Sequence, residues 1–255
     1  MQSLLIDAPA PGVRSIFLNR PHARNAIDAT IRRSLLEALD SADAEEGVRV
    51  VLLGGTDGMF CAGGDLQSMS ALSAAAARER IQEGGAIVNR LWRYPKPVVV
   101  ALQRFAVGAG AGLALLADYV VMGEDAIISF PFLKLGLVAD WGLMKTLPWR
   151  VGNVTASRLL SSAAVVVAKE ALQLGLASRA VVPDTVIEHA IATSAVLAKL
   201  PRRAFARMKA GLRSDDISAI LDAECEAQVA CLTGGEFAEG YAALREKRIA
   251  DFLSL

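Results

Sequence analysis

Residues 96–118 read KPVVVALQRFAVGAGAGLALLAD, and this stretch decides the fold more than any other. The run at 97–102 predicts a buried strand, and a loop containing Gly108, Gly110 and Gly112 leads into a short apolar helix. The first amides of a helix lack partners within it, and the helix dipole makes that end positive. Such an end can hold an anion or a developing oxyanion, although small residues also simply let a helix pack closely on a sheet. Both interpretations stay open for this segment alone.

The glycine spacing differs from that of nucleotide-binding loops. The dinucleotide fingerprint is G-x-G-x-x-G, whereas this segment reads G-x-G-x-G before a very short helix. A P-loop is excluded because no G-K-[ST] occurs in the chain.

Composition narrows the class of protein. The chain has 255 residues, of which 53% are hydrophobic, so it can bury a large core. Lys and Arg number 27, as do Asp and Glu, and this balance gives no basic surplus for nucleic acid or anionic lipid. A near-neutral, apolar chain of this kind is typical of proteins that self-associate.

Cysteine and histidine usage points away from disulfides, metals and a serine triad. Three cysteines form no even framework, and residues 1–7 lack a basic, apolar leader, so we expect a cytoplasmic protein. The longest apolar run, 105–122, is rich in glycine and contains Asp118, which makes it a poor membrane span. With two histidines and no G-x-S-x-G, we expect neither a zinc site nor a serine nucleophile, and no cofactor.

Strands and helices alternate in the first part of the chain. Strands are predicted at 13–18, 48–53, 97–102, 119–122 and 126–129, and helices at 27–44, 71–92 and 109–117. Helices alone are predicted after residue 184, at 186–199, 202–212, 217–232 and 235–250. We therefore expect an α/β core over 1–184 and a helical region over 185–255, which packs on the core or on another subunit.

Two loops of small residues follow two of these strands. One is FCAGGDL at 60–66, and the other begins at Gly108. In open α/β sheets, ligands bind beyond the carboxyl ends of the strands. These loops could therefore direct two backbone amides at one oxygen atom.

The chain resembles the crotonase superfamily, the enoyl-CoA hydratases and isomerases, along nearly its whole length. Five segments carry the resemblance in the family's order: NRPHARNA at 19–26, FCAGGDL at 60–66, the stretch at 96–118, SFPFLKLGLVADWG at 129–142 and EGYAALREKRIADF at 239–252. Each segment is weakly specific alone, whereas their combination at family spacing is specific. The resemblance implies a spiral of ββα units, C-terminal helices that form homotrimers or homohexamers, and an acyl-CoA thioester as ligand.

The resemblance also implies roles for particular positions. The amides of Gly64 and Ala109 would form an oxyanion hole for the thioester oxygen. Lys247 matches a lysine that reaches the CoA phosphates of a neighbouring subunit, although a solvated surface charge is an equal alternative. The remaining expected substrate- and CoA-binding positions are Arg24, Ala62, Gly63, Asp65, Leu66, Met69, Gly110, Phe132 and Trp141.

Both catalytic glutamates of the hydratases are absent. Gly112 stands in the place of the first, and Phe132 follows Pro131 in the place of the second. Because neither residue can activate water or supply a proton, we do not expect hydratase activity.

Asp140 matches the position at which several isomerases of the family keep their only catalytic carboxylate. One carboxylate suffices for allylic isomerisation, because it can remove a proton beside the thioester and return it two carbons away. Apolar neighbours such as Val138 and Trp141 would raise its pKa and strengthen it as a base. The alternative is that Asp140 caps a helix that begins near Trp141.

Several related reactions need residues that the chain lacks. Dehalogenases of the family add a histidine, and neither His22 nor His189 is suitably placed, while dienoyl-CoA isomerases need acids at positions 112 and 132. Two isomerase reactions remain: a Δ3 to Δ2 enoyl-CoA shift, or rearrangement of a ring-type acyl-CoA such as 1,2-epoxyphenylacetyl-CoA. A hydratase-type lyase and a non-catalytic acyl-CoA-binding protein stay as alternatives.

Overall fold

Strands β3 (Val50–Gly55) and β4 (Val98–Leu102) form the centre of the larger of two sheets, in a computed structural model that describes residues 2–214 and 216–255. Every residue of both strands is buried, which explains why each reads as an unbroken apolar run. This sheet has the order β1-β2-β3-β4-β6-β9, with β1 (Leu4–Ala10) and β2 (Val13–Leu18) antiparallel at one edge. The strands β2, β3, β4, β6 (Tyr119–Gly123) and β9 (Arg179–Val181) run parallel.

A second, three-stranded sheet lies beside the first. It has the order β5-β7-β8, with bounds Phe105–Val107, Ile127–Ser129 and Val165–Val167. The short segment between β4 and β5 moves the chain from the first sheet to the second, and β7 then pairs parallel to β5. Helix α3 (Ala109–Leu115) follows β5 directly, so its first residue lies beside both the second sheet and the loop after β3.

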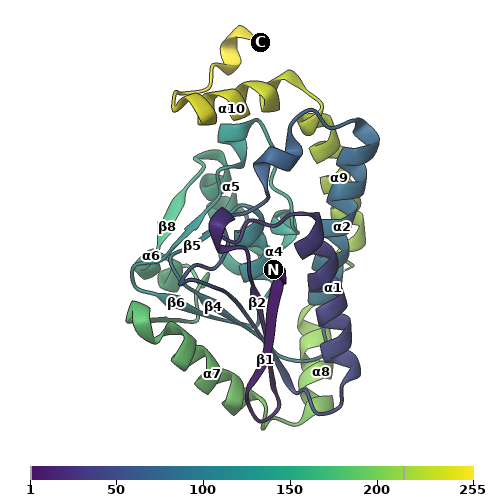
Figure 1. The fold of residues 1–255 in the computed structure, drawn as a ribbon, viewed down its shortest axis with the longest axis vertical. Helices are drawn as coiled ribbons and strands as arrows, with labels where there is room; N and C mark the ends of the chain where they lie inside the picture. Colours follow the sequence, from purple (N-terminus) through teal and green to yellow (C-terminus); the bar gives the residue numbers. More distant parts are fainter. Residues whose placement is uncertain (1, 215) are drawn as a thin grey trace.

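Helices cover both faces of the larger sheet (Figure 1). Helix α7 (Val186–Leu197) packs on β3, β4 and β6 over a core that contains Val50, Val99 and Val121. The main core lies on the other face, where α1 (Ala29–Ala44) packs against α2 (Ala74–Trp92) and α9 (Ser218–Leu232) packs along α2. The other α-helices are α4 (Leu143–Val151), α5 (Asn153–Ser161), α6 (Ala168–Gln173), α8 (Arg202–Leu212) and α10 (Gly235–Glu246).

Short 3-10 helices link several of these elements. They are η1 (Pro21–Ala23), η2 (Leu66–Met69), η3 (Phe132–Leu135), η4 (Pro183–Thr185) and η5 (Phe252–Ser254). Helix α10 contacts η3 and α9, and Figure 1 shows it with the C-terminus at the end of the molecule beyond α5. The C-terminal helices therefore contribute to the surroundings of η3.

A buried charge cluster ties the C-terminal helices to the sheet. Asp118 accepts hydrogen bonds from Val98 N at 2.8 Å and Lys209 Nζ at 2.6 Å, and its other oxygen pairs with Arg213 at 3.0 Å. Arg213 also donates to the carbonyls of Leu91 and Leu116. Asp118 therefore has a structural role, because it joins β4 to α8 and the residue that follows α8.

The predicted fold class is confirmed, and most predicted elements occur within three residues of their expected ends. The prediction missed β1, whose residues after Leu4 are mostly exposed and do not alternate, and the three-residue strands β5, β8 and β9. It also missed helices α4 to α6, which are at most nine residues long. Within the described ranges, no helix is both long and apolar enough to cross a bilayer.

Candidate functional site

The two glycine-rich loops lie against each other, joined by main-chain hydrogen bonds. Cys61 N donates to Phe105 O and Val107 N donates to Cys61 O, both at 3.1 Å. A Cβ on Gly63 would lie 2.7 Å from Val107 O, and a Cβ on Gly110 would lie 2.7 Å from Cys61 O. The close approach of the two loops therefore requires glycine at both positions.

This arrangement leaves the amides of Gly64 and Ala109 free at the same pocket. Ile27 N donates a hydrogen bond of 2.8 Å to Gly63 O, and Ile27 O accepts one of 3.0 Å from Asp65 N. The amide of Gly64, which lies between these two residues, takes no part in this pairing. Ala109 is the first residue of α3, where an N–H has no acceptor within the helix. Neither amide has a hydrogen-bond acceptor in the described part of the chain, and both residues line the pocket.

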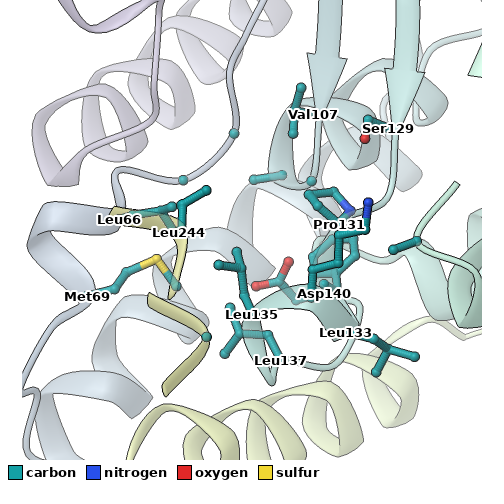
Figure 2. Close-up of a pocket in the computed structure, with 18 of the residues that line it drawn as sticks. Leu66, Met69, Val107, Ser129, Pro131, Leu133, Leu135, Leu137, Asp140 and Leu244 are labelled. Carbon is teal, nitrogen blue, oxygen red and sulfur yellow. The ribbon is translucent and has the colours of Figure 1, made fainter. Parts of the chain in front are cut away.

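The pocket has a volume of about 1040 Å³, which is large enough for a ligand of substantial size. Its walls come from the two loops, α2, η3, the segment before α4, α9 and the end of α10. Figure 2 shows a largely apolar lining into which the carboxylate of Asp140 points, toward the side where Leu66 and Met69 lie.

Asp140 is the only carboxylate among the described residues that line the pocket. Its side chain is buried, and Gln228 Nε2 donates a hydrogen bond of 3.0 Å to its Oδ2. Burial raises the pKa of Asp140 to about 6, while the Gln228 hydrogen bond and the charge of Arg80 act in the opposite direction. The carboxylate is thus a stronger base than an exposed aspartate and still ionises near neutral pH.

Gln228 on α9 fixes the orientation of this carboxylate. Its Oε1 accepts a hydrogen bond of 3.2 Å from Val138 N, so the side-chain amide is held at both ends. This role of Gln228 was not identified from the sequence. A detectable signal was the pair Glu224 and Gln228, two buried polar residues four apart on the apolar face of a helix.

Asp140 is not the cap of the following helix, so that alternative is wrong. The N-cap of α4 is Gly142, and no side chain of its own segment caps the helix. Glu224 from α9 takes this role, because its two oxygens accept hydrogen bonds from Gly142 N at 2.9 Å and Met144 N at 3.1 Å. Burial raises the pKa of Glu224 to about 7, and the neighbouring Asp140 charge adds to the rise.

Trp141 occupies the space that a side chain at position 112 would need. A Cβ on Gly112 would lie 2.5 Å from Trp141 Cβ and 2.9 Å from Trp141 O, well inside van der Waals contact. The indole ring also packs against Gly84 of α2, where an added Cβ would lie 3.4 Å from it. The backbone of Trp141 has φ +56°, an unusual value for a bulky residue. The packing of Trp141 therefore leaves no room for a glutamate side chain at position 112.

The other expected site residues fall into two groups. Among the described residues that line the pocket are Arg24, Ala62, Gly63, Gly64, Leu66, Met69, Ala109, Phe132, Asp140 and Trp141. Three lie outside the lining: Gly110 packs on Cys61, Asp65 pairs with Arg20 at 2.8 Å and caps η2, and Lys247 is an exposed C-cap of α10.

Three arginines of the pocket were missed from the sequence: Arg32, Arg80 and Arg248. Arg32 on α1 is buried and pairs with Glu83 at 2.7 Å, and Arg80 on α2 lines the pocket near Gly64. The sequence signal for Arg80 is its spacing, because it lies between the buried residues Ala77 and Gly84 of the same helix face. No described cluster of His, Cys, Asp and Glu side chains could hold a metal ion.

Comparisons with known proteins agree with this geometry. A family model described as enoyl-CoA hydratase/isomerase matches residues 9–254. The chain is 31% identical to the 2,3-dehydroadipyl-CoA hydratase of Escherichia coli, over 98% of each chain. It is 29% identical to the 1,2-epoxyphenylacetyl-CoA isomerase of the same organism, over 99% of each chain. The crystal structure of an enoyl-CoA hydratase/isomerase from Pseudoalteromonas atlantica superimposes with a TM-score of 0.89 at 26% identity, covering 98% of this chain and 99% of that one.

The relatives include proteins named hydratase and proteins named isomerase, so the comparisons support the family's chemistry on acyl-CoA thioesters without choosing between the two reactions. The match over nearly all residues, the shared fold and the paired glycine loops lead to one conclusion. The chain belongs to the enoyl-CoA hydratase/isomerase family, within the crotonase superfamily.

Proposed function

We propose that the protein is an acyl-CoA isomerase that moves a double bond with Asp140 as its single proton carrier. The observation that carries the proposal is that Asp140 alone among the described acids lines the pocket, with a pKa raised to about 6. The space for a second acid at position 112 is taken by Trp141.

The reaction follows from the placement of three groups. The thioester oxygen accepts hydrogen bonds from the amides of Gly64 and Ala109, and the Asp140 carboxylate removes a proton from the α-carbon of a 3-enoyl chain. The electron pair of that C–H bond moves into a dienolate, whose negative charge gathers on the thioester oxygen and is stabilised by the two amides. Asp140 then returns the same proton to the γ-carbon, which leaves a 2-enoyl thioester.

Two substrate classes fit this chemistry: 3-enoyl-CoA chains and ring-type acyl-CoA such as 1,2-epoxyphenylacetyl-CoA, for which one relative is named. The CoA portion would lie along Arg24, Ala62, Gly63 and Leu66, and Lys247 would reach the CoA phosphates of a neighbouring subunit.

The helical region 185–255 would form a homotrimer or homohexamer in the cytoplasm. Ile249 and Leu253 in its last part are 92% and 99% exposed, as expected for apolar residues that a neighbouring subunit covers.

Hydration is the second candidate, because one relative is named for it. Addition of water needs a group that activates the water molecule, and Glu224 is an acid close enough for the charge of Asp140 to raise its pKa. Both of its oxygens already accept hydrogen bonds from the amides of Gly142 and Met144, and it does not line the pocket. This arrangement favours isomerisation over hydration.

The decisive variant is Asp140→Asn, which keeps the shape of the side chain and removes the base. We expect isomerisation of 3-hexenoyl-CoA and exchange of its α-protons with deuterated water to fall by about 10⁴-fold, while binding of the thioester persists. The matched control is Asp184→Asn, the same change at an exposed position in η4, which should leave both rates unchanged.

Three results would overturn the proposal. Wild-type turnover by the Asn variant would exclude Asp140 as the base. Tight binding of acyl-CoA by the native protein without proton exchange would identify a non-catalytic binding protein. Hydration of crotonyl-CoA without isomerisation of 3-hexenoyl-CoA would identify a hydratase.

A further inference from the structure

Arg80 is a cation in the pocket with unused hydrogen-bond donors. Its Nη1 donates to Ser68 Oγ at 2.8 Å, and its Nη2 makes a long hydrogen bond of 3.4 Å to Asp65 O. A guanidinium has five N–H donors, and Arg80 forms no ion pair with any described carboxylate. Most of its capacity to bind an anion therefore remains available.

Arg32, Arg213 and Arg150 differ from Arg80 in this respect. Arg32, which also lines the pocket, is paired with Glu83 at 2.7 Å, and Arg213 is paired with Asp118 at 3.0 Å. Arg150 pairs with no carboxylate among the described residues, yet it donates to three carbonyls at 2.6 to 3.2 Å. Arg80 is thus a poorly satisfied cation in a partly desolvated place, a condition that an anionic ligand would relieve.

The electrostatic surroundings of Arg80 also favour an anion. Burial lowers its pKa to about 10 and the positive charge of Arg32 contributes to the fall, while the charges of Asp140, Asp65 and Glu83 act in the opposite direction. The guanidinium remains charged at neutral pH. Asp140 is the one carboxylate of the described lining, and it is hydrogen-bonded to Gln228 instead of Arg80. An anionic ligand could therefore pair with the positive charge of the Arg80 guanidinium.

The position of the guanidinium limits where the anion can lie. A Cβ built on Gly64 would be 3.2 Å from Arg80 Nη2, so the guanidinium lies next to the loop that presents the Gly64 amide. A thioester oxygen bound to that amide would place the first carbons of the acyl chain near Arg80. The anionic group must then lie only a few bonds from the thioester.

We propose that Arg80 binds a carboxylate carried by the acyl group itself, so that the preferred substrates are short dicarboxylic acyl-CoA thioesters. A carboxylate accepts two parallel hydrogen bonds from a guanidinium, a geometry that an uncharged chain of the same length cannot use. This inference rests on the proposed function for its kinetic readout, and on the pocket alone for its binding readout.

Arg80 could instead serve only to hold η2 through Ser68, or only to influence the ionisation of Asp140. Either role would affect every substrate equally, since neither involves the far end of the acyl chain. A pair of substrates that differ only in a terminal carboxylate separates these roles from recognition.

The test compares 3-hexenedioyl-CoA with 3-hexenoyl-CoA in the wild-type protein and in Arg80→Gln, Arg80→Lys and Arg93→Gln. Arg93→Gln is the matched control, because Arg93 follows the same helix but pairs with Asp216 at the surface, outside the pocket. We expect the wild type to prefer the dicarboxylic substrate in kcat/KM, and Arg80→Gln to lose roughly 100-fold on it. The loss on 3-hexenoyl-CoA should be much smaller, because only the effect of the Arg80 charge on Asp140 is removed there. The kcat/KM of Arg80→Lys on the dicarboxylic substrate should lie between the values of the wild type and of Arg80→Gln. Arg93→Gln should match the wild type on both substrates.

A second readout uses unreactive ligands, so that failure of the proposed reaction can be told from failure of this inference. Calorimetric titration with adipoyl-CoA and hexanoyl-CoA should show tighter binding of adipoyl-CoA, lost in Arg80→Gln. If this holds while no isomerisation occurs, the proposed function is wrong and the carboxylate site stands. Equal losses on both ligands, or no preference in the wild type, would overturn the inference; circular dichroism of each variant verifies that it is folded.

Discussion

The two sides of the pocket are built from different parts of the chain and in different ways. The side proposed to bind the thioester oxygen consists of main-chain groups, with the loops after β3 and β5 joined by hydrogen bonds through Cys61. The side proposed to move the proton consists of side chains, with Asp140 held by Gln228 from 88 residues away and the start of α4 held by Glu224 from 82 residues away. Binding geometry thus depends on local glycines, whereas the basicity of Asp140 depends on the packing of α9.

The sharpest way to separate the two sides is to remove one main-chain donor. Ala109 is the first residue of α3, a position at which proline is tolerated, so Ala109→Pro deletes the N–H without breaking the helix. We expect kcat to fall by roughly 10² to 10³-fold, or about 3–4 kcal/mol in transition-state stabilisation. Ala109→Gly keeps the N–H and is the control.

Single-turnover rates, together with the affinity for a saturated acyl-CoA, measure this loss. An Ala109→Pro protein that folds and retains the wild-type rate would show that the amide does not contact the thioester oxygen.

The next effect concerns stability on the side of the carboxylate. The folded protein raises the pKa of Asp140 from 3.8 to about 6, so the native state binds this proton more tightly than the unfolded chain. The ionised carboxylate therefore costs stability as pH rises from 3.8 to about 6, up to about 3 kcal/mol once ionisation is complete. Asp140→Asn should be more stable than the wild type by up to that amount at pH 7.5, and the difference should nearly vanish near pH 4.

Urea unfolding of both proteins at the two pH values provides the measurement. Asp184→Asn, at an exposed site, should show no such pH-dependent gain. A gain that is equal at both pH values would mean that ionisation of Asp140 is not its source.

The smallest effect tests the hydrogen bonds that join Gln228 of α9 to the segment before α4. Gln228→Leu removes the hydrogen bond that lowers the pKa of Asp140 and leaves Val138 N without its acceptor. We expect kcat/KM at pH 7 to fall about tenfold, with the acidic limb of the pH profile displaced to higher pH and activity partly recovered in alkaline buffer. A loss that is the same at every pH would indicate a purely structural role.

Gln82→Leu is the matched control for this variant, because Gln82 is an exposed glutamine of α2 and does not line the pocket. Its pH profile should coincide with that of the wild type.

The same contrast explains how much the sequence could predict. The buried strands, the glycine loops and the carboxylate at position 140 follow from patterns within short segments, and the fold class followed from their order. Gln228, Glu224 and Arg80 could not be assigned in advance, because their roles depend on which helix faces meet, and α9 contacts α2 and α4 only in the folded chain. The role of Asp140 was ambiguous for the same reason. Only the folded structure shows that the distant Glu224 accepts hydrogen bonds from the start of α4, so that Asp140 does not serve as the helix cap.

The packing of Trp141 on Gly112 and Gly84 has a consequence for which substitutions this part of the pocket tolerates. An acid introduced at position 112 would overlap the tryptophan, and a smaller residue at 141 would leave a void with nothing to fill it. Each of these single changes is therefore destabilising, so an acid at position 112 requires a simultaneous change at position 141.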